Sequence, residues 1–213
     1  MPVTRGIVPG GAVDAPIPTG PFTTSAGGPY LVSTGAVVPA ATSKITVSML
    51  VTFNSVNSNY YMNLFSFANA SENFRIYAGG NRKLFYTVLD DTGAVVSNSG
   101  VRTGAFITFD TPQLLTFSLD LSNKLTIANN TNGLLSGYVL TAGSGAMATD
   151  LKFYSLRNPA GSMQLEGAVE YIKVWFGQST TDGSEPAATP DIEITGPKTA
   201  INPHIWKQGA DAV

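Results

Sequence analysis

The sequence predicts an all-β protein, a sandwich of two antiparallel sheets, and three observations support this prediction. Polar and apolar residues alternate in segments such as ITVSMLVTF, where Ile45 and Val47 share one strand face and Thr46 and Ser48 share the other. Gly, Asn and Asp interrupt such segments about every 8 to 12 residues. No window of the chain keeps a helical period of about 3.6 residues over three turns.

The chain opens with a segment, residues 1 to 43, that we expect to be an extended N-terminal arm. Proline recurs from Pro2 to Pro39 too often for a helix or a central strand. Apolar residues nevertheless persist, and we expect Phe22 and Tyr30 among them to contact a partner protein. A flexible leader without contacts is the alternative, although such leaders are usually more polar.

The sandwich itself is expected in residues 44 to 177, followed by a loop and an irregular C-terminal tail in residues 178 to 213. Residues 73–78 and 83–89 flank the turn Gly79-Gly80-Asn81 and predict a hairpin. The complete set of expected strands is 45–53, 60–68, 73–78, 83–89, 94–97, 105–109, 113–121, 124–128, 134–140, 150–156, 165–176 and 191–195.

Composition limits the classes of partner. Charged residues make up only 12% of the 213 residues, about half the usual share for soluble proteins, which suits a protein that places much of its surface against neighbours. The formal net charge is −2 and the 12 basic residues are scattered, so neither nucleic acid nor an anionic membrane is an expected partner.

Two further absences in the sequence bear on its location and chemistry. The chain has no cysteine, which excludes disulfides and thiolate metal sites. The N-terminal residues MPVTRGIVPGG contain no apolar run of signal-peptide length, and no stretch approaches the roughly 20 apolar residues of a membrane-spanning helix. We therefore expect synthesis in the cytosol without export by a cleaved signal.

Residues 44 to about 177 resemble the concanavalin A-like lectin/glucanase superfamily, especially its laminin-G-like domains. The resemblance lies in the order of features: the opening strand ITVSMLVTF, the stretch PQLLTFSLDLSNKLTIANNTNGLLSG, and the closing element LEGAVEYIKVWFG. In the closing element the matching residues are Gly167, Val169, Glu170, Ile172, Val174 and Trp175. The resemblance implies a jelly roll of two antiparallel sheets whose apolar inner faces form the core.

The tail segment TGPKTAINPHIWKQGAD is similar to segments that end some virion proteins of tailed phages. This resemblance fits the low charge, the long arm and the missing signal peptide, because virion proteins are made in the host cytoplasm. Trp206 in this tail is expected to anchor it to another subunit or to the sandwich. His204 is expected to be a surface or interface residue of the same contact.

Catalysis is not expected. Glycoside hydrolysis needs two carboxylates about 5 to 10 Å apart, whereas Glu166 and Glu170 on one strand face would lie about 13 Å apart. Glucanases of the superfamily carry Glu-x-Asp-x-x-Glu or a close variant, which this chain lacks. His204 is the only histidine, so a Ser-His-Asp triad would have to draw on the irregular tail.

Calcium is the only cofactor that the sequence leaves open. Asp90, Asp91 and Asp120 lie near the ends of expected strands, where hard cations take oxygen ligands from loops and where members of this superfamily often hold calcium. Aspartate is also common in turns for its own hydrogen bonds, which is the alternative interpretation of these residues.

The sequence supports two hypotheses about the function of the protein. The leading hypothesis is a non-enzymatic virion structural protein, a capsid decoration protein that clasps the major capsid protein and copies of itself through its arm and tail. The alternative is a glycan-binding module of a tail fibre or head fibre that mediates attachment to the host surface. For that alternative the candidate stacking residues are Tyr61, Tyr77 and Tyr86, which could equally be packing residues.

Overall fold

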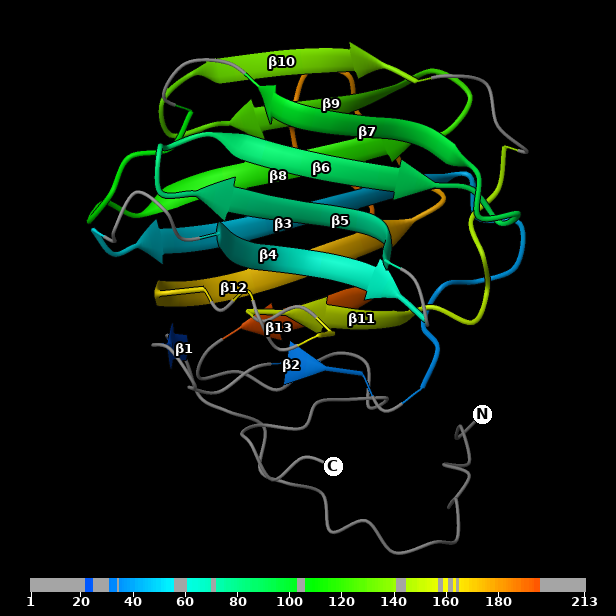
Figure 1. Cartoon of the computed structure of the whole chain (residues 1–213), viewed down its shortest axis with the longest axis horizontal. Helices are drawn as coiled ribbons and strands as arrows, with labels where there is room; N and C mark the ends of the chain where they lie inside the picture. The colour runs from blue at the N-terminus through cyan, green and yellow to red at the C-terminus, as the bar shows by residue number, and fades with distance from the viewer. Residues whose placement is uncertain are drawn as a thin grey trace, which may run out of the picture.

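Two antiparallel sheets pack face to face in the computed structural model, so the predicted all-β sandwich is confirmed (Figure 1). The structure describes residues 22–24, 31–33, 35–55, 61–69, 72–102, 106–140, 145–156, 159–160, 163 and 165–195, with backbone alone for 22–24, 72, 96–102 and 195. None of these residues belongs to a helix that could cross a membrane.

The seven-stranded sheet has the order β1-β12-β3-β8-β9-β10, and β13 also pairs with β12. Its strands are β1 (Phe22–Thr24), β3 (Lys44–Phe53), β8 (Gln113–Asp120), β9 (Lys124–Asn129), β10 (Leu134–Val139), β12 (Gly167–Phe176) and β13 (Ile192–Thr195). The strand expected at 45–53 is the centre of this sheet. Its inward residues from Ile45 to Phe53 are fully buried, as the alternation of polar and apolar residues predicted.

The six-stranded sheet has the order β2-β11-β4-β5-β6-β7 and lies in front of the other sheet in Figure 1. Its strands are β2 (Leu31–Val32), β4 (Tyr61–Ala68), β5 (Glu72–Gly79), β6 (Leu84–Leu89), β7 (Val95–Arg102) and β11 (Lys152–Ser155). The expected hairpin is present, because β5 pairs antiparallel with β6 across the turn at residues 80–83.

Aromatic rings join the two sheets in the core. Phe65 on β4 lies 5.4 Å from Phe117 on β8, centroid to centroid, and Phe67 lies 6.0 Å from Phe176 on β12. Both pairs are edge-to-face, an arrangement that aromatic quadrupoles favour. These contacts join the inner faces of the two sheets in one core.

Strands from both flanking segments join the sandwich. In the predicted arm, β1 pairs with β12 and β2 pairs with β11; in the predicted tail, β13 pairs with β12. The strand expected at 191–195 is therefore confirmed as β13. The division of the chain at residues 43/44 and 177/178 stays a prediction, but the sheets extend on both sides of it.

Residues 105–109 were expected to form a strand, and in their described part this is wrong. Phe106 and Ile107 are buried, but both backbone N–H groups donate to the carbonyl of Arg82. The Gln113 side chain then takes the place of a neighbouring strand, because its Oε1 accepts from the N–H of Thr108 at 2.8 Å and its amide donates back to the Thr108 carbonyl. The segment has apolar residues because its side chains are buried, and this apolar pattern was mistaken for that of a strand.

A loop formed by residues 178–190, hereafter the covering loop, lies across the outer face of the seven-stranded sheet. The indole nitrogen of Trp175 donates to the Ala188 carbonyl at 2.7 Å, and the Thr180 N–H donates to the Ser118 hydroxyl at 2.6 Å. Trp175 and Ser118 are consequently buried although they point away from the core. The covering loop occupies the outer face of the seven-stranded sheet. The outer face of the six-stranded sheet is therefore the candidate for a binding site.

Candidate functional site

A β-bulge in β4 sets which side chains reach the outer face of the six-stranded sheet. The pairing of β4 with β5 shifts between Asn63 and Phe65, so that Leu64 and Phe65 both turn into the core. Asn63 and Ser66 then share the outer face although they are three residues apart. The Ser66 hydroxyl accordingly donates to Asn63 Oδ1 at 2.9 Å.

Three aromatic rings gather on this outer face. Tyr77 on β5 and Phe85 on β6 are opposite each other in the ladder and stack with centroids 5.0 Å apart and planes 7° apart. The ring of Tyr61 meets both edge-on, at 5.5 Å from Tyr77 and 5.3 Å from Phe85. Tyr61 remains 47% exposed, whereas Phe85 is buried, so the stacked pair positions an exposed ring.

Polar groups complete the cluster, which we call the aromatic patch: Tyr61, Asn63, Arg75, Tyr77 and Phe85. Asn63 lies opposite Tyr77 in the ladder, and its fully buried Nδ2 has no hydrogen-bond partner. The guanidinium carbon of Arg75 lies 4.7 Å from the ring centroid of Tyr77, a cation–π contact. The patch therefore combines an exposed ring with a buried amide and a cation.

Of the three tyrosines predicted to bind glycan, the structure brings Tyr61 and Tyr77 together and separates Tyr86 from them. Tyr86 follows Phe85 on β6 and therefore points to the opposite face, into the core. It is 1% exposed, and its ring packs 5.2 Å from that of Tyr138 on β10. Tyr86 cannot share a binding surface with the other two.

The outer face of the seven-stranded sheet is occupied by the covering loop, which is fixed there by Glu185. The Glu185 carboxylate accepts hydrogen bonds from Ser48 at 2.7 Å and Tyr171 at 3.1 Å and forms an ion pair with Lys173 at 2.9 Å. Burial disfavours the charged carboxylate, yet these donors outweigh it and hold the pKa of Glu185 below its usual range. Burial and then the charge of Glu185 raise the pKa of Tyr171 to about 12.

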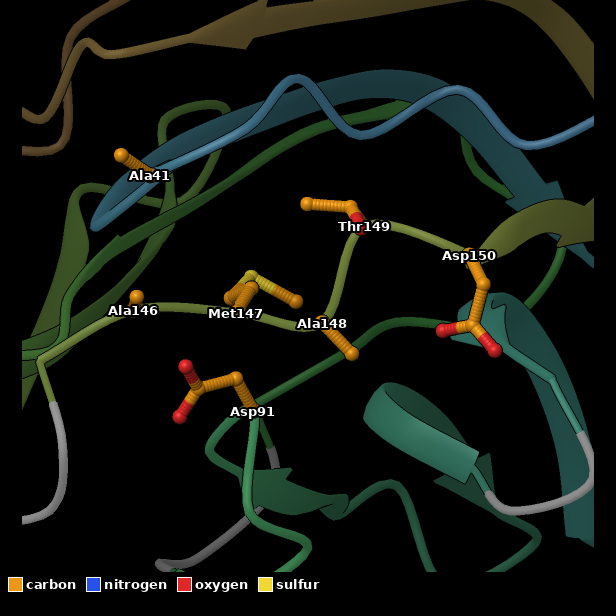
Figure 2. A pocket seen from close by; sticks show the side chains of 7 residues that line it. All are labelled: Ala41, Asp91, Ala146, Met147, Ala148, Thr149 and Asp150. Atoms are coloured by element: carbon orange, nitrogen blue, oxygen red, sulfur yellow. The ribbon is translucent and has the colours of Figure 1, made fainter.

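A pocket of about 500 Å³ lies among the loops at one end of the sandwich. Figure 2 shows the residues that line it: Ala41, Asp91, Ala146, Met147, Ala148, Thr149 and Asp150. The carboxylates of Asp91 and Asp150 lie on different sides of Ala148 and do not point toward a common centre (Figure 2). Asp150 already accepts two hydrogen bonds of 3.0 Å from the Asn69 amide.

The other two aspartates that the sequence offered as calcium ligands stabilise turns. Asp90 Oδ1 accepts hydrogen bonds from the N–H and hydroxyl of Thr92 and from the Ala94 N–H. Asp120 accepts from Ser122 and forms an ion pair of 3.1 Å with Lys44. Within the described ranges, no three His, Cys, Asp or Glu side chains are grouped as a metal site would require.

Glu166 and Glu170 do not form a regular pair on one strand face. The register of β12 against β3 shifts between Val169 and Tyr171, which places Glu170 at a bulge where its side chain is exposed. Glu166 precedes the strand, and its carbonyl accepts a hydrogen bond from the Asn54 N–H at 2.9 Å. The even spacing on which the distance of about 13 Å rested is thus interrupted.

The residues predicted to bind partner proteins fall largely outside the described part of the chain. Tyr30, His204 and Trp206 lie outside the described residues, and Phe22 is described by its backbone alone, as the first residue of β1. Their role stays a prediction.

Comparisons with known proteins show the fold. Over 90% of this chain and 93% of the other, the structure superposes on a heptameric SAP-like pentraxin from Limulus polyphemus with a TM-score of 0.54 at 12% identity. Tailspike protein 2 of an Escherichia coli O157:H7 bacteriophage matches 70% of this chain with a TM-score of 0.52 at 12% identity. The binding domain of botulinum neurotoxin DC matches 72% of this chain with a TM-score of 0.50 at 11% identity.

The chain thus has the concanavalin A-like jelly-roll fold, as its resemblance to that superfamily implied. It covers 22% of the tailspike chain and 40% of the neurotoxin chain. No protein-family model and no curated protein sequence matches it.

Sequence reasoning missed Phe85, Asn63 and Arg75. Phe85 was placed only within the expected strand at 83–89, with no face assigned to it, and the position of Asn63 depends on the bulge in β4. One signal was available: Arg75 and Tyr77 alternate with the apolar residues Phe74 and Ile76, which predicts a shared outer face. Glu185 was missed because its partners Ser48 and Lys173 are distant in the sequence.

Proposed function

We propose that this chain is a non-enzymatic saccharide-binding module of a phage virion, carried on an attachment structure such as a tail fibre or head fibre. The observation that carries the proposal is the ring of Tyr61, 47% exposed and oriented by edge contacts with Tyr77 and Phe85. Saccharides present apolar C–H faces that pack on such rings, and a ring that is already ordered loses little entropy on binding.

The chemistry of the aromatic patch supports binding rather than hydrolysis. Binding sites for small ligands place a few polar groups beside apolar surface, and here Arg75 contacts the ring of Tyr77, which Tyr61 meets edge-on. Hydrolysis of a glycosidic bond needs two carboxyl groups about 5 to 10 Å apart. None of the described side chains in the patch is a carboxylate.

Composition and comparison support the virion setting. With 12% charged residues the chain suits an assembled particle better than a free soluble protein. A sandwich of the same fold forms part of a phage tailspike protein, at 12% identity and 22% of that protein's length. The predicted partners are accordingly a saccharide and virion subunits, with neither nucleic acid nor membrane.

A glycan array probed with the full chain tests the proposal, together with Tyr61→Ala and Tyr61→Phe. Loss of the ring should weaken binding about tenfold or more, since burying one face of an aromatic side chain contributes about 1.5 kcal/mol. Phenylalanine keeps the ring and should stay within about threefold of the native chain. A chain that binds no saccharide, or a Tyr61→Ala variant that binds as the native chain does, contradicts the proposal.

A second candidate is the capsid decoration protein, and the edge at β10, where β9 is the one paired strand among the described residues, favours it. The strand LLSGYV carries no charge and no proline, and Leu135 and Val139 are 54% and 83% exposed. Proteins usually protect such an edge with charges, proline or a covering segment. Because the Leu140 N–H points to Asn123 on the β9 side, alternate residues Leu135, Gly137 and Val139 present their backbone groups to this edge.

Copies of this chain could pair antiparallel through β10 about a two-fold axis at Gly137, with Leu135 opposite Val139 of the second copy. The chain has no cysteine, so Gly137→Cys should cross-link two copies under mild oxidation, since Cα atoms about 5.5 Å apart suit a disulfide. Val139→Lys should abolish self-association in sedimentation. Val95→Cys and Val95→Lys, at an exposed apolar residue on β7, are the matched controls and should change nothing.

A further inference from the structure

The turn between β5 and β6 carries an exposed amide beside the aromatic patch, that of Asn81. We propose that Asn81 is the hydrogen-bond donor of the binding site and selects saccharides that carry acetamido groups. The inference rests on the proposed function and narrows the ligand to one class, the N-acetylated amino sugars. Three features support it: the place of Asn81 beside the rings, the hydrogen bonds of the turn, and the exposed surface of Tyr61.

Asn81 lies beside the aromatic patch because Gly79 has no side chain. Gly79 is opposite Tyr61 in the ladder between β4 and β5, and it follows Tyr77 on the outer face. A Cβ on Gly79 would lie 2.8 Å from Asn81 Oδ1 and 2.9 Å from the ring atom Cε2 of Phe85. The amide and the ring of Phe85 therefore border one space on the outer face, and that ring lies 5.3 Å from the ring of Tyr61, centroid to centroid.

The hydrogen bonds of the turn engage its acceptors and leave a donor on Asn81. The Gly79 carbonyl accepts from the Arg82 N–H at 3.0 Å, and the Lys83 carbonyl accepts from the Gly79 N–H at 2.9 Å. Asn81 Oδ1 accepts from the Lys83 N–H at 3.3 Å, which fixes the orientation of the amide. Asn81 Nδ2 has no hydrogen-bond partner among the described residues, so its N–H groups are the donors that the side chain offers to a ligand.

A donor beside an exposed ring fits an acetamido group. The carbonyl oxygen of this group accepts hydrogen bonds and donates none, whereas a sugar hydroxyl also carries a hydrogen that needs an acceptor. Because Oδ1 of Asn81 is engaged by the Lys83 N–H, the side chain satisfies a carbonyl more fully than a hydroxyl. The acetamido methyl group is apolar and packs on the ring of Tyr61, which is 47% exposed.

The two cations that follow Asn81 define the competing ligand. The guanidinium carbon of Arg82 lies 5.4 Å from the ring centroid of Phe109, so this cation is directed to a residue outside the patch. Lys83 precedes Phe85 by two residues and lies on the same face, where its charge would attract a carboxylate. An acidic saccharide is therefore the ligand that the experiment has to separate from an acetamido sugar.

Matched probes, measured with the full chain, test the inference. The first pair is chitotetraose and cellotetraose, compared by calorimetry, and the second pair is the methyl β-glycosides of N-acetylgalactosamine and galactose, compared by NMR titration. Within each pair the acetamido groups take the place of hydroxyls and nothing else differs. In at least one pair the acetamido member should bind about tenfold more tightly, which corresponds to about 1.4 kcal/mol.

Asn81→Asp tests the residue itself, because it keeps an acceptor for the Lys83 N–H and replaces the Nδ2 donor with an oxygen. It should weaken binding of the preferred acetamido probe about tenfold and remove the preference within the pair. Asn123→Asp is the matched control, since it makes the same change of charge at an exposed residue of the turn between β8 and β9. Its affinities should stay within about twofold of the native chain.

The outcomes separate this inference from the proposed function. Lack of a preference for the acetamido member in both pairs overturns the inference, and so does unchanged binding by Asn81→Asp. Tighter binding of a galacturonic acid tetramer than of chitotetraose also overturns it, in favour of an acidic ligand at Lys83. Each of these results leaves the proposed function standing, whereas binding of no saccharide on the array refutes both. Should Asn81→Asp fold poorly, the two pairs measured on the native chain still decide.

Discussion

At Gly167 the backbone of β12 lies directly against β3. Its φ of +153° is outside the range that other residues readily adopt, and a Cβ at this position would overlap the carbonyl oxygen of Thr52. The close approach allows the ladder between β12 and β3 to begin with the pair Gly167 and Phe53. The family resemblance placed a small residue here, and the structure supplies the physical reason.

Replacing Gly167 with alanine should therefore destabilise the sandwich by about 2 to 5 kcal/mol, from backbone strain and from overlap with Thr52. Urea unfolding of the variant measures this as a lower midpoint. Gly93→Ala isolates the contribution of backbone strain, because Gly93 has a φ of +79° and no atom lies within 4 Å of the added Cβ. This variant should lose only about 1 kcal/mol of stability. Gly35→Ala has neither feature and should have almost no effect, so equal losses at all three glycines would contradict the explanation.

At the scale of elements, the covering loop shows what the strand pattern could not predict. Its sequence, QSTTDGSEPAATP, is polar and without period, and it was correctly expected to be a loop. Its place on the outer face depends on Glu185, which meets Ser48, 137 residues earlier in the chain. Such long-range polar contacts leave no local signal in a single sequence, whereas a period of two does.

The covering loop should make stability depend on pH through Glu185. A carboxylate whose pKa is lower in the folded chain stabilises it above the unfolded pKa of about 4.3, and this contribution is lost as the pH falls through the folded value. Glu185→Gln should therefore be less stable than the native chain at pH 7 but nearly equal to it near pH 3. Thermal unfolding between pH 3 and pH 7 measures the difference.

The control for this prediction is Glu170→Gln, which changes the charge equally at an exposed position on β12. Its stability should follow the native curve at every pH. If the gap between Glu185→Gln and the native chain stays constant from pH 7 to pH 3, ionisation of Glu185 does not fix the covering loop.

For the whole molecule, the sandwich was predictable because its signal is local: alternation of side chains decides which residues of a strand face inward. The aromatic patch was only half predictable for the same reason. Tyr61 and Tyr77 were separated from Tyr86 by the pleat, since a shift of one residue along a strand moves a side chain to the other face. The bulge turns both Leu64 and Phe65 inward and thereby places Asn63 and Ser66 on the same outer face. The alternation of polar and apolar residues in β4 did not indicate this bulge.

The two outermost strands next to the chain ends, β1 and β13, are attached to the same strand, β12, and lie at the far side of the molecule from β10 (Figure 1). Four residue pairs join β13 to β12, from Tyr171–Thr195 to Val174–Ile192. Tension applied at residue 195 acts first on the pair Thr195–Tyr171 and then on the following pairs in turn. A particle that pulls on this end would thus lengthen the connection while the aromatic patch, on the other sheet, keeps its shape.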